Sequence, residues 1–341
     1  MKKITIKDIA KLGGVSIATV SKIVNGKDHD IGEATKKRIE LIMKEQNYVP
    51  NRLARSLVTK KTKTIGLVIP DITNPFFPEI VRGAEDKAQE EGYSIFFCNS
   101  DDSLEKEEKY IQNLMEKMVD GIIFTASSKR ITEGELLSNA NIPMVLVDRQ
   151  IESKNIRTSI LVDNKEGAKI AIKHLIELGH KKILHLTGPK EARITQARLE
   201  GYKETLEESK IDIDENLIQF GEYKMGSGYE GILDILNRNI DFTAIFCGND
   251  MIALGVMKAL KEKKIKVPKD ISIVGFDDIY VSSLIHPSLT TISQPKYQMG
   301  YKAVAVMIDI LEGRIQSHEN MILMPELKIR ETTLNLKEKV K

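Results

Sequence analysis

The chain is poor in cysteine and in long apolar runs, and each shortage excludes a class of protein. Its 2 cysteines, Cys98 and Cys247, are too few for a disulfide framework, and neither has a cysteine or histidine at metal-ligand spacing. No stretch approaches the roughly 18 apolar residues that indicate a membrane span. Asp8 interrupts the N-terminal segment before the apolar core of a secretion signal could form. We therefore expect a cytoplasmic protein with no membrane partner.

Signatures of catalysis are also scarce. The closely spaced His174, His180 and His185 do not form an H-E-x-x-H zinc motif. The segment "GSGYEG", residues 226–231, has G-x-G-x-x-G spacing but does not directly follow an apolar run, which disfavours a dinucleotide-binding loop. No nucleophile is paired with a recognisable base. We expect no catalytic residue, no metal and no cofactor.

The net charge of +2 hides an uneven distribution. Residues 1–63 hold 15 Lys and Arg against 6 Asp and Glu, a net charge of +9, so residues 64–341 carry 36 against 43, a net charge of −7. A small basic segment joined to a mildly acidic body is typical of a polyanion-binding module tethered to a separate domain, because phosphate contacts dominate DNA affinity.

Two short amphipathic helices joined by a glycine turn are predicted in "DIAKLGGVSIATVSKIVNG", residues 8–26. Gly13 and Gly14 supply the turn, and Ser16 is expected to cap the second helix. Apolar residues at three-and-four spacing give each helix one inward face. These residues are Ile6, Ile9 and Ala10 on the first helix and Val20, Ile23 and Val24 on the second.

The outward face of the second helix suits a DNA major groove. Ile17 and Ala18 could touch thymine methyl groups, and Lys22 could donate to guanine O6 and N7. Ser16 and Ser21 could bond phosphates. The pattern fits a helix-turn-helix, while an ordinary helical hairpin is the alternative that these residues leave open.

From residue 64 onward, short apolar runs alternate with helical segments in two series. This alternation predicts an α/β fold with two lobes, each a parallel sheet covered by helices on both faces. Ligands of such sheets bind beyond the carboxyl ends of the strands, so Asn74, Asp148, Asn249 and Asp277, which terminate or follow the runs, are candidates. The runs are 64–70, 93–99, 121–125 and 144–148, then 182–188, 217–220, 244–250 and 271–278.

Nearly the whole chain resembles the LacI/GalR family of bacterial transcription repressors. "TIKDIAKLGGVSIATVSKIVNG" is similar to the family's DNA-binding signature, and "HLIELGHKKILHLTGP", "GNDMIALGVMKAL" and "ISIVGFDD" with "PSLTTISQP" are similar to its core segments. One residue departs from the pattern, because Lys22 stands where most members have arginine and lacks the bidentate fork for guanine. The resemblance implies that the head contacts DNA through Thr5, Ser16, Ile17, Ala18, Ser21, Lys22 and Asn25.

The resemblance also gives a role to "LARSL", residues 53–57. In the family this segment becomes helical on DNA and inserts a leucine into the minor groove. Ala54 and Leu57 are therefore expected to contact DNA, with Leu57 as the wedge that unstacks and bends the site. Packing of Leu57 on the body is the reading that composition alone favours.

The body resembles a ribose-type periplasmic sugar-binding protein, in which two lobes close on a monosaccharide. Aromatic rings stack on the apolar faces of a sugar, carboxylates accept from its hydroxyls, and Arg, Asn and Gln donate to them. The matching residues are Asn74, Phe76, Phe77, Asp148, Arg149, Arg198, Tyr223, Asn249, Asp277 and Gln294.

These observations predict an all-α helix-turn-helix head and an α/β two-lobed body that resembles periplasmic binding proteins. A homodimer is expected because one helix-turn-helix reads only a half-site. The expected domains are the head at 1–49, a hinge helix and linker at 50–63, and an effector-binding and dimerisation domain at 64–338. Its lobes are expected at about 64–160 with 292–320, and at about 161–291 with 321–338.

The predicted function is sequence-specific repression of sugar metabolism, with a palindromic operator and a small sugar, ribose or another pentose, as partners. Two alternatives stay open. One is a catabolite regulator controlled by a phosphoprotein. The other is a cytoplasmic sugar-binding protein or enzyme that does not bind DNA.

Overall fold

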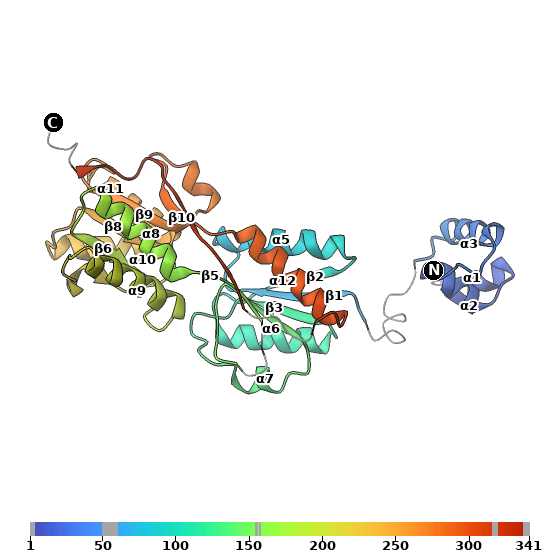
Figure 1. Ribbon diagram of the computed structural model, residues 1–341. Coiled ribbons are helices and arrows are strands. Elements are labelled where there is room, and N and C mark those ends of the chain that lie inside the picture. The colour runs from blue at the N-terminus through green and yellow to red at the C-terminus, as the bar shows by residue number, and fades with distance from the viewer. Residues whose placement is uncertain (1–3, 50–60, 154–155, 157, 316–319, 337–341) are drawn as a thin grey trace. The chain divides into compact units, whose positions relative to one another are not determined.

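The computed structural model describes residues 4–49, 61–153, 156, 158–315 and 320–336. The chain divides into two compact units, residues 1–62 and 63–341 (Figure 1). In the described segments, no helix has both the length and the apolar character needed to cross a bilayer.

The first unit is a three-helix head. Helices α1 (Ile6–Gly13), α2 (Ile17–Val24) and α3 (Glu33–Glu45) pack around a small core whose fully buried members are Ile9, Val20 and Ile39. The predicted cap of α2 is confirmed, because the Ser16 hydroxyl accepts a hydrogen bond from the Thr19 amide at 3.1 Å. The head is thus a helix-turn-helix in which the third helix supplies the core that two short helices lack.

The second unit begins with a parallel sheet of strand order β11-β5-β4-β3-β1-β2. In this first lobe, α5 and α12 lie on one face of the sheet and α6 on the other (Figure 1). The elements are β1 (Thr64–Ile69), α5 (Phe76–Glu90), β2 (Ser94–Asn99), α6 (Leu104–Glu116), β3 (Gly121–Phe124), α7 (Gly134–Ser138), β4 (Met144–Val147), β5 (Ser159–Val162), α12 (Lys296–Leu311) and β11 (Met321–Leu323).

The second lobe repeats this plan with strand order β12-β10-β9-β8-β6-β7, parallel except for the antiparallel β12. Helices α8 and α9 pack together, as do α10 and α11. The elements are α8 (Asn164–Glu177), β6 (Ile183–Leu186), α9 (Arg193–Glu208), η1 (Glu215–Leu217), β7 (Ile218–Gln219), α10 (Met225–Asn237), β8 (Ala244–Cys247), α11 (Asp250–Glu262), β9 (Ser272–Asp277), η2 (Tyr280–Ser283), β10 (Thr290–Ser293) and β12 (Glu326–Lys328).

Each central strand contributes to two cores because alternate side chains point to opposite faces. In β1, Ile65 and Leu67 join the core beneath α5 and α12, whereas Val68 joins the core beneath α6. In β8, Ile245 and Phe246 divide in the same way between the two helical layers of the second lobe. Burial on both faces explains why these strands read as continuous apolar runs.

The predicted lobe boundaries require correction. Strand β5 lies wholly in the first sheet, so the first crossing follows residue 162 rather than 160. Strand β10 lies wholly in the second sheet, which moves the second crossing from 291 to beyond residue 293. Strand β11, expected in the second lobe, pairs in parallel with β5 of the first, so the last crossing follows residue 323. Backbone pairing at the sheet edge decides the assignment of this short strand.

Candidate functional site

The outward surface of α2 carries the predicted base-reading residues. Ile17 is 45% exposed, and Ala18 and Lys22 are also exposed. Ser21 is half-buried, and its carbonyl oxygen accepts a hydrogen bond from the side-chain nitrogen of Asn25 at 2.7 Å. An exposed apolar side chain beside a cation is an unusual solvent face and is compatible with groove contact.

Lys22 already has a partner in the head. Its ammonium forms an ion pair with Asp30, which follows α2. The hydrogen bond from Lys22 holds the pKa of Asp30 below its ordinary value. Because both side chains are exposed, this pair contributes little to stability and can exchange for a contact with DNA.

Thr5 and Ser16 cap helices rather than standing free. The Thr5 hydroxyl oxygen accepts from the Asp8 backbone amide at 3.4 Å, and the Asp8 carboxylate accepts from the Thr5 backbone amide at 2.9 Å, forming a capping box at the start of α1. Both residues are exposed at helix N-termini, where phosphate contacts are favoured. Ala54 and Leu57 lie outside the described residues, and their contact with DNA stays a prediction.

A cavity between the two lobes brings together all ten residues predicted to bind a ligand. It is lined by Asn74, Phe76, Phe77, Asp148, Arg149, Arg198, Tyr223, Asn249, Asp277 and Gln294, together with Ile194. Its volume is about 20 Å³, and a single water needs roughly 10–15 Å³. A larger ligand therefore requires the surrounding side chains or the lobes to move apart. Ligand contact by these residues stays a prediction.

Most of these side chains lie where the sheet topology favours a site, at the carboxyl ends of parallel strands. Asp148 and Arg149 follow β4, Asp277 ends β9 and Gln294 follows β10. Asn249 follows β8 and caps α11 by accepting from the Ile252 amide at 2.9 Å.

The aromatic side of the cavity combines residues of both lobes. Phe76 and Phe77 begin α5 and pack edge to face, with their ring centroids 5.1 Å apart. Asn74 fixes the turn before them, because its side-chain oxygen accepts from the Phe76 amide at 3.0 Å. Tyr223 comes from the second lobe and shares a 2.7 Å hydrogen bond with Thr195.

Arg198 of α9 is the most enclosed cation of the cavity, with only 2% of its surface exposed. Its Nε donates to Asn164 at 2.8 Å, and its Nη1 donates to the Gly248 carbonyl. The guanidinium also stacks on Phe276, with its central carbon 3.7 Å from the ring centroid. Packing and hydrogen bonding therefore hold this guanidinium in one orientation before any ligand arrives.

Both acids of the cavity occupy unusual backbone conformations. Asp148 has φ 69° and Asp277 has φ 114°, in a region that residues other than glycine rarely adopt. Burial raises the pKa of Asp277 to about 8 against the opposing charge of Arg198, whose Nη2 lies 4.0 Å from Asp277 Oδ1. Burial also raises the pKa of Asp148. Backbone strain and shifted pKa values at the same residues are typical of functional sites.

Two polar atoms of the cavity lack hydrogen-bond partners among the described residues, namely Arg149 Nε and Gln294 Oε1. The nitrogen of the same Gln294 amide has a partner, because Nε2 donates to Asp277 Oδ1 at 2.7 Å. Buried polar atoms without partners are rare and costly, so both are candidates for contact with a bound molecule. Ile194 was not among the residues predicted from the sequence, although it precedes Arg198 by four residues on α9 and so lies on the same helix face.

The other candidates of the sequence have structural roles. His180 Nδ1 shares a 2.9 Å hydrogen bond with Thr243, and the described residues contain no cluster of metal-binding side chains. "GSGYEG" lies inside the first turns of α10, where Gly228 approaches the backbone of α11, and not in a loop between a strand and a helix.

Comparison with known proteins agrees with this architecture. Residues 5–51 match the family of bacterial regulatory proteins of the lacI type, and residues 172–333 match a periplasmic binding protein-like domain. The HTH-type transcriptional regulator RegA of Clostridium saccharobutylicum is 41% identical over 331 residues, covering 97% of this chain and 99% of the relative. The ribose operon repressor of Halalkalibacterium halodurans is 39% identical over 329 residues, covering 96% and 97%. A solved Lac repressor dimer bound to operator and the anti-inducer ONPF has a TM-score of 0.86 and 29% identity, covering 98% and 100%.

A helix-turn-helix head joined to a two-lobed, periplasmic-binding-protein-like effector domain defines a class of transcriptional regulator. The chain belongs to the lacI family of bacterial regulatory proteins. It is a DNA-binding transcriptional regulator and not an enzyme, which removes the enzyme from the alternatives.

Proposed function

We propose that this regulator is a repressor of sugar metabolism whose effector is a small neutral monosaccharide, with a pentose such as ribose as first choice. The observation that carries the proposal is the composition of the inter-lobe cavity. Two arginines, two acids, three amides and three aromatic rings converge there from both lobes. This set matches the polar edges and apolar faces of a sugar ring. The 39% identical ribose operon repressor supports the choice of pentose.

The effector enters when the lobes separate and is enclosed when they close. The small volume of the cavity supports this order, because the lining side chains fill it in the described conformation. Closure would place Asp277 and Arg198 of the second lobe opposite Asp148 and Arg149 of the first. Hydroxyl groups of one sugar could then bridge both lobes and shift the population of the closed form.

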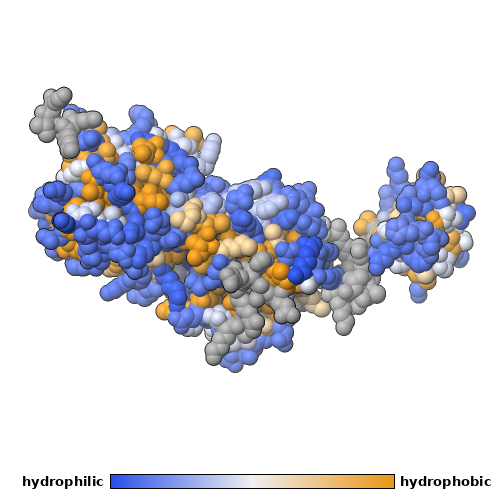
Figure 2. Space-filling model, in the orientation of Figure 1, coloured by the Kyte–Doolittle hydropathy of each residue, from blue (hydrophilic) through white to orange (hydrophobic). Residues whose placement is uncertain are grey.

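The proposed regulator acts as a homodimer on palindromic operator DNA. Strand β2 is an edge strand, and its Phe96 and Phe97 are 48% and 38% exposed. On the face drawn in Figure 2, hydrophobic residues of the body gather in patches separated by hydrophilic surface. An edge strand that pairs with β1 on one side and carries exposed aromatic rings is suited to pairing with a second copy on the other. The solved Lac repressor, bound to its operator as a dimer, supports this arrangement.

The effector assignment is tested by replacing Asp277 with asparagine. Asp277→Asn keeps the shape of the side chain but removes the charge that accepts from sugar hydroxyls, so sugar affinity should fall by about 1.5–3 kcal/mol. The measurement is a sugar titration of operator binding, with a palindromic duplex that the wild-type protein selects from a random library. The midpoint should move to higher sugar concentration while DNA affinity without sugar stays close to wild type.

Asp278→Asn is the matched control. Asp278 is adjacent, has φ 55° and pairs with Arg330 outside the cavity. It should leave the midpoint unchanged. An unchanged midpoint for Asp277→Asn would remove this acid from the effector site. If no pentose or hexose alters operator binding by the wild-type protein, the sugar assignment fails.

DNA reading by the head is tested with Lys22→Ala. Discrimination at one base pair of each half-site should fall by roughly 1–3 kcal/mol, while binding driven by phosphate contacts persists. The measurement compares affinities for single-base variants of the selected duplex. Lys37→Ala on α3 is the control, because it removes an equal charge from an exposed position of the same head. Full discrimination in Lys22→Ala at every position would show that Lys22 reads no base.

A further inference from the structure

Arg149 reaches the cavity from the first lobe, but the groups that hold it lie behind the cavity wall. Its Nη1 donates to Asp102 Oδ1 at 2.7 Å and to the Ala126 carbonyl at 3.0 Å. Its Nε faces the other way, lies 3.8 Å from Asp148 and has no hydrogen-bond partner among the described residues. One edge of the guanidinium is thus used by the protein, while Nε is available to a ligand.

Asp102 is itself fixed by several independent contacts. Its Oδ1 accepts from the Ser128 amide at 2.9 Å, and its other oxygen accepts from the Ser128 hydroxyl. Its amide donates to the Pro70 carbonyl at 2.8 Å, which ties the turn to the end of β1. Although burial opposes ionisation, Arg149 and Ser128 together hold the pKa of Asp102 below its ordinary value. Asp102 is therefore a fixed negative charge.

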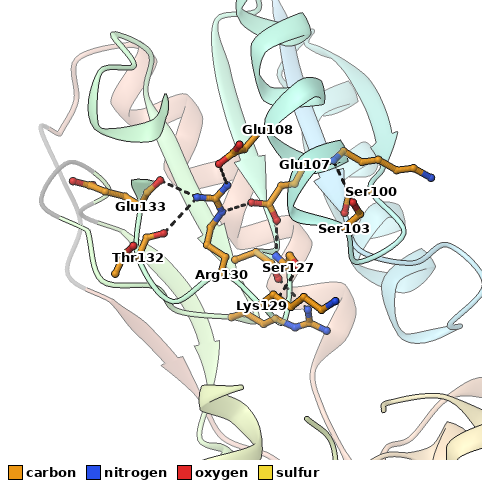
Figure 3. A network of polar contacts seen from close by, with 12 residues as sticks. Ser100, Ser103, Glu107, Glu108, Ser127, Lys129, Arg130, Thr132 and Glu133 are labelled. Atoms are coloured by element: carbon orange, nitrogen blue, oxygen red, sulfur yellow. Dashed lines mark hydrogen bonds and ion pairs between the residues drawn. The ribbon is translucent and has the colours of Figure 1, made fainter. Parts of the chain in front are cut away.

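The loop that carries Ser128 is anchored by a second, deeper ion pair. Figure 3 shows Glu107 between Arg130 and Ser127, and Arg130 reaching Glu108, Thr132 and Glu133 as well. Glu107 accepts from Arg130 Nε and from the Ser127 amide, and both charged side chains are almost fully buried. The Ser127 hydroxyl then donates to the Asp102 carbonyl at 2.8 Å. A continuous network thus runs from α6 to Arg149.

We propose, on the basis of the function proposed above, that Asp102 is a positioning residue of the effector site. Asp102 lines no part of the cavity, yet it fixes the Arg149 guanidinium and supplies its counter-charge from outside. Arg149 can then donate to sugar hydroxyls without requiring an anionic ligand, so the cavity favours neutral molecules over anions.

Charge balance explains the preference for neutral ligands. The charged groups that line the cavity are Asp148, Arg149, Arg198 and Asp277. Because burial raises the pKa of Asp277 to about 8, this acid is mostly uncharged in the empty site near neutral pH, and the two arginines outweigh the one remaining acid, Asp148. Asp102 offsets the positive charge of Arg149, to which it is hydrogen-bonded. Removal of its charge would leave the cavity attractive to a small anion.

The test uses Asp102→Asn in the full-length protein, with D-ribose as ligand and inorganic phosphate as competing anion at constant ionic strength. Asparagine tolerates the left-handed conformation of this residue, φ 54°, and keeps one acceptor for Arg149. Calorimetry should give at least a fivefold loss of ribose affinity. Phosphate should compete with ribose several-fold better in the variant than in the wild type. A merely structural defect would weaken binding of both ligands alike.

Asp101→Asn is the matched control, because Asp101 is adjacent, has φ 53° and pairs with the exposed Lys106. It should change neither affinity nor phosphate competition. When Arg149→Gln is already present, adding Asp102→Asn should lower ribose affinity less than twofold, because the guanidinium that Asp102 positions is gone. Ser128→Ala removes one hydrogen bond from Asp102 and should give a smaller loss of ribose affinity. This variant replaces Asp102→Asn in the test if Asp102→Asn does not fold.

Wild-type ribose affinity in Asp102→Asn, or equal phosphate competition in both proteins, would overturn the role of Asp102 alone. An equal loss in the Arg149→Gln background would also overturn it, because the effect would not pass through Arg149. Absence of ribose binding to the wild type would instead count against the proposed function, and the role of Asp102 would fall with it.

Discussion

The two lobes each send one arginine into the cavity, but they hold it in opposite ways. In the first lobe, Arg149 is held by the ionised Asp102, which lies outside the cavity. In the second lobe, Arg198 is held by neutral acceptors and an aromatic ring, and the acid nearest to it, Asp277, lies inside the cavity. The charge of Arg149 is therefore compensated by an acid outside the cavity, and the charge of Arg198 by an acid inside it. Only the second arrangement should depend strongly on pH.

The largest expected effect comes from removal of the second-lobe arginine. Arg198→Met leaves the acceptors on Asn164 and Gly248 without their donor in a buried site. Each unsatisfied buried acceptor costs about 1–3 kcal/mol, so the free energy of unfolding should fall by roughly 2–6 kcal/mol, together with loss of sugar binding. Chemical denaturation measures the first effect and calorimetry the second. Arg149→Met leaves Asp102 and the Ala126 carbonyl without their donor and should also lose sugar binding and stability. Unchanged stability in either variant would contradict the contacts assigned to that arginine.

The next effect is a pH dependence of sugar affinity that arises in the second lobe. The pKa of Asp277 is raised to about 8, chiefly by burial, while a sugar that donates to its carboxylate favours the ionised form. Binding therefore releases a proton, and affinity should rise by up to tenfold per pH unit until the pH reaches about 8. Sugar titrations from pH 6 to pH 9 measure this slope, which Asp277→Asn should flatten and Asp102→Asn should preserve.

The same group makes stability change with pH in the opposite direction. Because the folded pKa of Asp277 lies above its unfolded value of 3.8, its contribution is fully present below about pH 4. That contribution is lost as the pH rises through about 8, by at most about 1.4 kcal/mol per pH unit. The measurement is the free energy of unfolding of the wild type and of Asp277→Asn between pH 4 and pH 8. The same pH dependence in both proteins would indicate that Asp277 is already ionised in the free protein.

The smallest effect is expected at an exposed ion pair that joins the two lobes outside the cavity. Glu152, from the loop after β4, pairs with Arg193 at the start of α9, 2.5 Å apart, and both side chains are largely exposed. Exposed pairs contribute about 0–1 kcal/mol, so Glu152→Gln should weaken sugar binding less than fivefold. High salt should reduce wild-type affinity to the level of the variant. A larger loss would make this pair a main determinant of closure.

Much of the fold could be predicted because its signals are local. The Ser16 cap and the apolar runs that became β1, β3, β4, β8 and β9 follow from periodicity and helix capping. Strand β11 was assigned to the wrong lobe because its three residues carry no pattern of their own and are defined by pairing with β5, more than 150 residues away. Short edge strands depend on tertiary pairing that periodicity does not contain.

The candidate site divides along the same line. Ten of its eleven lining residues could be named from the sequence, because they follow strands or match a family pattern. Asp102 could not be predicted from the sequence. It lies 47 residues before Arg149, and no sequence pattern connects the two positions. The raised pKa of Asp277 was also beyond the sequence, because burial sets it and burial depends on both lobes.

The repeated crossing of the chain between the lobes has a consequence for synthesis on the ribosome. The core of the first lobe needs α12, whose Gly300 allows contact with the backbone of α5 more than 200 residues earlier in the chain. Its sheet is closed by β11 at residues 321–323. An emerging chain therefore exposes the apolar face of α5 until α12, residues 296–311, has been made. We expect truncated chains that stop before residue 296 to depend on chaperones, although they contain most of both lobes.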